Sequence, residues 1–163
     1  MSSPGAVEVR ILELPVVVWA DTQEYYDDLL REFALLAAAN QQGIDHTPAQ
    51  LLALVEELQR DYDQLSVAQS AQLAMAVEAG RSSLDLTYLV PVGVADACRR
   101  VDEAFDAADA YCRAGDYLLS LACPPEATMF RRWFLGEFVR QVEGQPPCPW
   151  PAWRRRAADQ PTS

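Results

Sequence analysis

The chain has 163 residues, of which 50% are hydrophobic and 23% are charged, a composition typical of one globular domain with its own core. The formal net charge of −11 argues against nucleic acids and anionic membranes as partners, because an acidic surface repels phosphate. The thirteen basic residues are all arginine, which excludes lysine chemistry such as Schiff-base formation.

The N-terminal segment lacks the basic stretch and the long apolar run of a signal peptide. Its most apolar part, from Leu14 to Ala20, is far too short to span a bilayer. We therefore expect a cytoplasmic protein that makes no contact with a membrane.

Residues 7–19 are rich in β-branched residues that alternate loosely with charged ones, which predicts a strand broken or bent at Pro15. Asp21, followed three residues later by Glu24, is typical of a capping box at the start of a helix. Apolar spacings of three and four then predict a helix that ends near Asn40.

Two shorter helices should follow. Thr47 and Pro48 form a capping pair that predicts a helix start, and the apolar pattern fades near Tyr62. An alanine-rich helix should begin at Ser66, and Gly80 is a natural residue to follow its end.

Residues 83–90 alternate at first between apolar and polar side chains and precede Pro91. This pattern favours a short strand that could pair with the first one, with a helical turn as the alternative. The clearest helix of the chain runs from about Val92 to Ala114, where a stripe of apolar residues forms a packing face.

A short helical turn is expected at 116–122, and the last long helix should run from Pro124 to near Gly144. The fold class predicted for residues 1–144 is therefore mainly α, with about five helices around one core and a small two-stranded β element. Four aromatic side chains are expected in that core: Phe105, Phe130, Trp133 and Phe134.

The composition changes from Gln145, and the segment 145–163 is rich in proline, tryptophan and arginine. We expect a tail that does not continue the helix. Its alternatives are disorder or a contact element, in which Trp150 packs back on the last helix and the arginines meet an acidic surface.

No metal site, cofactor or catalytic motif is predicted. The lone histidine, His46, lies in a loop, and the cysteines lack the clustered spacing of zinc ligands. Two of them share one helix too far apart to pair, which favours reduced thiols. The four cysteines are Cys98, Cys112, Cys123 and Cys148.

Acidic side chains gather on the helix after Val92, and arginines gather on the last long helix. We interpret Asp102, Glu103, Asp106 and Asp109 as a solvated acidic face, because the Glu-x-x-His pairs of a carboxylate metal site are missing. The arginines could pair with the acidic helices or bind an acidic partner. The candidate partner-binding residues are Arg132, Arg140, Trp150, Trp153, Arg154, Arg155 and Arg156.

Three segments, DLLREFALL at 28–36, LDLTYLVP at 84–91 and FRRWFLGEFVRQ at 130–141, occur together with a proline-tryptophan segment at 147–150. In this order they resemble an uncharacterised group of small actinobacterial proteins, over about residues 7–151. That group is associated with serine-kinase-type anti-sigma factors and STAS-domain antagonists. The resemblance implies a place in a partner-switching stress circuit, and it carries over no functional residue.

The function expected is that of a non-enzymatic regulatory module that binds another protein, with an anti-sigma-type kinase or a STAS-domain protein as the partner that the resemblance implies. The alternative is a small-molecule sensor with an apolar pocket between the two C-terminal long helices. An enzyme of unknown type is a third hypothesis, and self-association is left open.

Overall fold

The computed structural model describes residues 5–39, 47–114 and 124–160. It is mainly α with a small two-stranded antiparallel sheet, as predicted. Of the six helices that the described residues form, five lie within residues 1–144, where about five were expected, and the sixth lies in the C-terminal segment. In chain order the elements are β1 (Ala6–Pro15), α1 (Val16–Ala39), α2 (Thr47–Tyr62), a short 3-10 turn (Asp63–Leu65), α3 (Val67–Glu78), β2 (Ser83–Pro91), α4 (Val94–Ala114), α5 (Pro125–Val142) and α6 (Trp150–Asp159).

The two predicted strands pair with each other, so the alternative of a helical turn at 83–90 is wrong. β1 runs antiparallel to β2, with Val9 opposite Tyr88, and a bulge interrupts the register between Ile11 and Leu14. Within the bulge Glu13 adopts a φ of 53°, a conformation that costs energy in a residue other than glycine. Its main-chain N–H donates to Asp85 Oδ1 at 2.8 Å, which ties the bulge to β2.

Glutamine side chains cover main-chain groups on both outer edges of the sheet. Arg10 and Thr87 face each other across the sheet, and their outward main-chain groups need other partners. Gln141 of α5 accepts from Arg10 N and donates to Arg10 O, both at 2.8 Å. Gln69 of α3 donates to Thr87 O at 2.5 Å.

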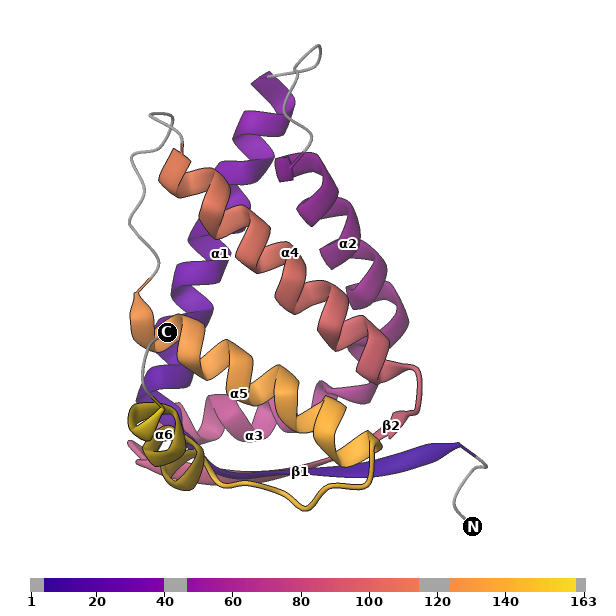
Figure 1. The fold of residues 1–163 in the computed structure, drawn as a ribbon, viewed down its shortest axis with the longest axis vertical. Helices are drawn as coiled ribbons and strands as arrows, with labels where there is room; N and C mark the ends of the chain where they lie inside the picture. Colours follow the sequence, from indigo (N-terminus) through magenta and orange to yellow (C-terminus); the bar gives the residue numbers. More distant parts are fainter. Residues whose placement is uncertain (1–4, 40–46, 115–123, 161–163) are drawn as a thin grey trace.

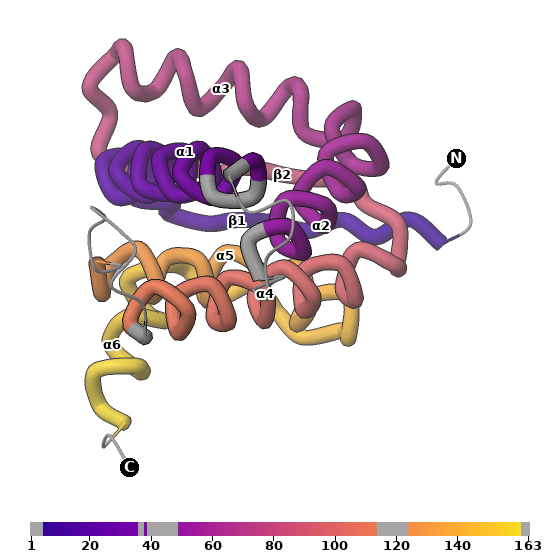
Figure 2. Tube along the Cα trace, turned by 90° about the horizontal axis from the view of Figure 1, so that it is seen from above, coloured from indigo at the N-terminus to yellow at the C-terminus, as the bar shows by residue number. Residues whose placement is uncertain are grey.

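The helices lie on one side of the sheet, which forms one end of the molecule (Figure 1). Figure 2 shows α3 on one side of α1, with α4 and α5 on the other. α5 and α6 contact β1, and α3 contacts β2. α4 crosses in front of α1 and beside α2 in Figure 1. One core cluster joins the sheet to α5 and α6, and a second joins α1, α2 and α4.

The aromatic core expected from the sequence is present. Phe105, Phe130 and Trp133 are buried, and Phe134 is half-buried at the wall of a pocket described below. α2 begins and ends where predicted, and Gly80, with a φ of 65°, follows the end of α3 as expected.

The start of α1 was predicted wrongly. The helix begins at Val16, directly after the strand, and Asp21 lies in its second turn instead of capping it. The Val16 side chain is buried and its N–H donates to Ser82 O at 3.2 Å. These tertiary contacts override the preference of three consecutive valines for extended structure.

The segment 145–163 does not continue α5, as expected, but it contains a separate helix, α6, that was not predicted. Pro149 and Pro151 flank the first helical residue, Trp150. Proline is tolerated there since the first N–H groups of a helix have no intrahelical acceptor. The predicted turn at 116–122, His46 and Cys123 lie outside the described residues. No helix within the described ranges is long and apolar enough to cross a membrane.

Candidate functional site

Trp150 anchors the C-terminal helix on the core, as the contact hypothesis predicted. Its side chain is 5% exposed, and its ring centroid lies 5.9 Å from that of Phe130 and 5.4 Å from that of Trp133. The indole Nε1–H of Trp133 in turn donates to the main-chain carbonyl of Cys148 at 2.9 Å. α6 is therefore attached to α5 by ring packing and by a partly buried hydrogen bond to the segment that precedes it.

A fully buried carboxylate, Glu137, fixes the connection between α5 and α6. Its Oε2 accepts from the main-chain N–H of Cys148 at 3.0 Å and from Gln141 Nε2 at 2.8 Å. Its Oε1 pairs with Arg140. Since Gln141 also holds Arg10 of β1, one polar network joins α5, the sheet edge and the segment before α6.

Three of the candidate arginines form ion pairs within the chain. Arg132 pairs with Asp106 of α4 at 3.5 Å, and Arg140 pairs with Glu137 on its own helix. Arg154 pairs with Glu126 at 3.6 Å, and its guanidinium lies 6.0 Å from the ring centroid of Trp150.

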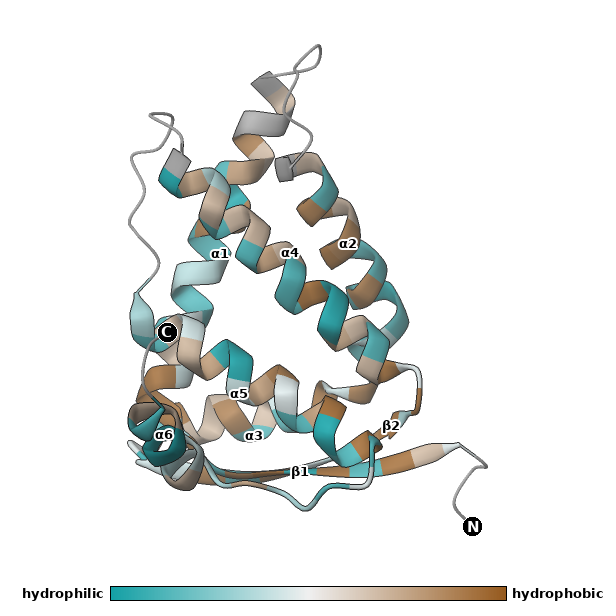
Figure 3. Ribbon diagram, viewed as in Figure 1, coloured by the Kyte–Doolittle hydropathy of each residue, from teal (hydrophilic) through white to brown (hydrophobic). Residues whose placement is uncertain are grey.

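Arg155 and Arg156 differ from these, because they are exposed and form no ion pair with any residue that the structure describes. Trp153 is half-buried and stacks on Trp150 at 5.8 Å. Figure 3 shows strongly hydrophilic positions along this helix. We call the exposed pair Arg155 and Arg156, which lie about 100° apart around the helix axis, the arginine face of α6; Arg154 and Trp153 flank it in sequence.

Arg131 is a buried charge among the arginines of the last long helix, for which pairing with the acidic helices was one of the two expected alternatives. It is 5% exposed and donates to Asp102 at 2.8 Å, to Asp106 and to the hydroxyl of Tyr26 at 3.2 Å. Burial alone would lower its pKa, but Tyr26, Asp102 and Asp106 outweigh burial and raise the pKa, so the guanidinium stays charged.

These ion pairs correct the interpretation of the acidic residues on α4. Asp102 and Asp106 neutralise Arg131 instead of forming only a solvated face. Their spacing of four residues, which puts both on one side of a helix, was the signal that could have suggested a shared cationic partner.

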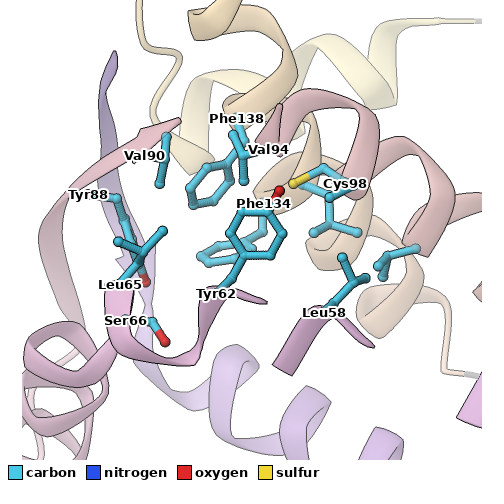
Figure 4. A pocket seen from close by; sticks show the side chains of 13 residues that line it. Leu58, Tyr62, Leu65, Ser66, Tyr88, Val90, Val94, Cys98, Phe134 and Phe138 are labelled. Carbon is cyan, nitrogen blue, oxygen red and sulfur yellow. The ribbon is translucent and has the colours of Figure 1, made fainter. Parts of the chain in front are cut away.

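An apolar pocket of about 240 Å³ lies between α2, α4, α5 and β2. The alternative hypothesis placed a pocket between α4 and α5, and those helices do form two of its walls; the contributions of α2 and β2 were not predicted. Figure 4 shows aromatic rings from three elements pointing into it. Its lining includes Tyr62, Ser66, Tyr88, Val90, Val94, Cys98, Phe134 and Phe138.

A second, more polar hollow of about 380 Å³ adjoins the first. The two share several lining residues, among them Tyr62, Ser66 and Phe134. The second hollow continues past Arg131 to Tyr26 and Gln59. Together they form one depression that is apolar at one end and polar at the other.

The ionisable groups in the apolar pocket are held in their neutral forms. Burial raises the pKa of the Cys98 thiol from its ordinary value of 9.0 to about 12. Burial also raises the pKa of Tyr88 and, together with Asp61, that of Tyr62. A charged side chain is absent from the described residues that line this pocket.

The thiols follow the expected placement on the described part of the chain. Cys98 and Cys112 share α4, as predicted, and Cys98 and Cys148 carry free thiols. Within the described ranges, no group of three or more histidine, cysteine, aspartate or glutamate side chains could hold a metal ion.

Comparison of the chain with models of known protein families, with curated proteins and with solved structures found no match. The resemblance to proteins of partner-switching circuits is therefore still a prediction.

Proposed function

We propose that this protein is a non-enzymatic regulatory module that binds another protein through the arginine face of α6. The observation that carries the proposal is that Arg155 and Arg156 project, without an ion pair among the described residues, from a helix that Trp150 anchors in the core. The chain as a whole is strongly acidic, with a net charge of −11, so the consecutive arginines of α6 are opposite in charge to the protein as a whole.

The physical chemistry of the face suits protein recognition. Arginine and tryptophan are enriched at the centres of protein interfaces, where they combine apolar contact with directed hydrogen bonds. Because α6 is already docked through Trp150 and the network of Glu137, binding would order little additional chain, which lowers its entropic cost.

The partner that fits is a protein with an acidic surface patch, since complementary charge steers encounter and fixes orientation. The resemblance to proteins of partner-switching circuits suggests a cytoplasmic anti-sigma-type kinase or STAS-domain protein. We therefore propose a protein of one of these two classes as the partner.

Affinity purification from the native cytoplasm tests the proposal. The full chain should retain one protein in stoichiometric amount, and the double variant Arg155→Glu/Arg156→Glu should lose it. The matched control is Arg60→Glu/Arg81→Glu, which makes the same change of net charge at two other exposed arginines.

The proposal fails if the control variant loses the protein as completely as the α6 variant does, or if both retain it. Light scattering on the isolated chain distinguishes self-association from binding of a different protein. If the chain forms a dimer and the Arg155→Glu/Arg156→Glu variant does not, the partner is a second copy of this chain.

A further inference from the structure

Four aromatic rings line the pocket between α2, α4, α5 and β2, together with leucine and valine side chains. Tyr88 contacts Phe134 and Phe138 edge to face, at 6.3 and 5.1 Å between centroids. Tyr62, from the end of α2, approaches from the opposite wall in Figure 4, with its hydroxyl beside the sulfur of Cys98. Rings in this arrangement offer both faces and edges to an aromatic guest.

The electrostatics of the pocket select against charge. No charged side chain lines it within the described residues, and its polar atoms are the hydroxyls of Tyr62, Tyr88 and Ser66 and the thiol of Cys98. An ion that entered would lose its hydration without gaining a counter-charge, which is costly.

The adjoining polar hollow does not supply that counter-charge to an anion. Arg131, the cation that lines it, already donates to Asp102, Asp106 and Tyr26. The carboxylates of Asp27 and Asp63 also line this hollow, so an anionic group placed there would be repelled.

The size of the pocket limits the guest. An apolar cavity of roughly 150 Å³ holds a benzene molecule, so about 240 Å³ has room for one or two rings. Ser66 lines both hollows, and its hydroxyl, which donates to Asp63 O at 3.2 Å, is left to accept a hydrogen bond from a polar group of the guest.

We propose that this pocket binds an uncharged one- or two-ring molecule that carries a hydroxyl or amide group directed toward Ser66. The proposal is independent of protein binding at α6. Occupancy would place the guest against Phe134 and Phe138 of α5, the helix on which α6 is docked.

Calorimetric titration of the full chain with two matched probes tests the proposal. β-Naphthol is neutral at neutral pH, whereas β-naphthoate has the same ring system and a negative charge. We expect saturable one-to-one binding of β-naphthol in the micromolar to submillimolar range, and binding of β-naphthoate at least about tenfold weaker, because the carboxylate must be desolvated.

A variant locates the site. Ala97 is buried on α4 and lines the pocket, so Ala97→Phe should fill the space and abolish binding of β-naphthol. Ala107→Phe makes the same change at an exposed position of the same helix and should bind as the unaltered chain does. Methyl NMR of the unaltered chain gives a second location that does not depend on the variant: β-naphthol should shift the signals of Val90 and Val94.

The proposal is overturned if the two probes bind equally well or if β-naphthol does not saturate the chain. It is also overturned if a folded Ala97→Phe variant binds β-naphthol undiminished, or if the methyl signals of Val90 and Val94 do not move.

Discussion

Glu137 is a buried carboxylate whose bonds reach its own helix and the segment before α6. Replacing it with alanine removes the acceptor for the main-chain N–H of Cys148 and for Gln141 Nε2. We expect Glu137→Ala to lower the free energy of unfolding by about 2–4 kcal/mol, because buried donors are left unsatisfied. Urea unfolding followed by tryptophan fluorescence measures the loss.

Arg140→Ala is the control for this loss. Arg140 is the partly exposed partner of Glu137, so its removal leaves the buried donors bonded to the carboxylate. If Glu137→Ala cost no more than Arg140→Ala, the main-chain contact with Cys148 would have no role in holding α6.

Cys98 and Tyr88 make stability sensitive to alkaline pH. In the folded chain burial raises the pKa of Cys98 from 9.0 to about 12 and raises that of Tyr88 above its ordinary 10.0. The folded state therefore favours the protonated forms, and the stability they contribute is complete below pH 9.0. As the pH rises from 9.0 toward 12, the unfolded chain ionises first, so the melting temperature should fall.

Two variants separate the contributions at alkaline pH. Cys98→Ala and Tyr88→Phe each remove one ionisable group. Each variant should therefore show a smaller fall in melting temperature between neutral and alkaline pH, whatever its melting temperature at neutral pH. A decline of the same steepness in the double variant would show that other groups cause it.

The sequence predicted the location of single aromatic side chains better than that of ion pairs. Burial of Trp150 and Trp133 follows from the free energy of removing large apolar surfaces from water, whatever their partners. Whether Arg131 forms an ion pair with Asp102 or is exposed to solvent depends on the distance between α4 and α5. No local pattern in the sequence determines that distance.

At the scale of elements, α6 should contribute to stability through its first residue. Trp150→Ala is expected to lower the free energy of unfolding by about 3–5 kcal/mol, the usual range for a buried aromatic side chain. Trp153 is half-buried on the same helix, so Trp153→Ala should cost clearly less. Chemical denaturation of the two variants makes the comparison, and equal losses would show that Trp150 is not the anchor.

Helix boundaries were predictable where capping residues and apolar periodicity agree. They agree for α2, which starts at Thr47, and for α3, which ends before Gly80. They disagree at Val16, where β-branched residues favour a strand, and at Trp150, where prolines suggested a break. In both places burial against the sheet and α5 decided the conformation, and burial is not encoded within a short window of sequence.

On the scale of the whole molecule, net charge should dominate any encounter with nucleic acid. The arginine face of α6 is small beside a formal charge of −11. Mobility-shift measurements with duplex DNA and with RNA should therefore show no binding at about 0.15 M salt. A shift that Arg155→Glu/Arg156→Glu abolishes would mean that phosphate, and not an acidic protein, is what α6 recognises.

The architecture was predictable as a class, and the arginines of α6 were recognisable as candidates from composition, but the walls of the pocket were predictable only in part. Composition and periodicity were enough for a mainly α chain with two strands that could pair. The aromatic pocket requires the end of α2, the middle of β2 and α5 to converge, a tertiary arrangement that periodicity within each element does not specify.

The glutamines on the sheet edges limit how this protein can recruit other chains. A two-stranded ribbon with open edges is a template for strand addition, by a peptide or by another copy in aggregation. Here Gln141 occupies the outward groups of Arg10, and Gln69 occupies the carbonyl of Thr87. An incoming strand would have to displace a side-chain amide at Arg10 or at Thr87 before it could pair there, so the two glutamines disfavour strand addition across the middle of the sheet.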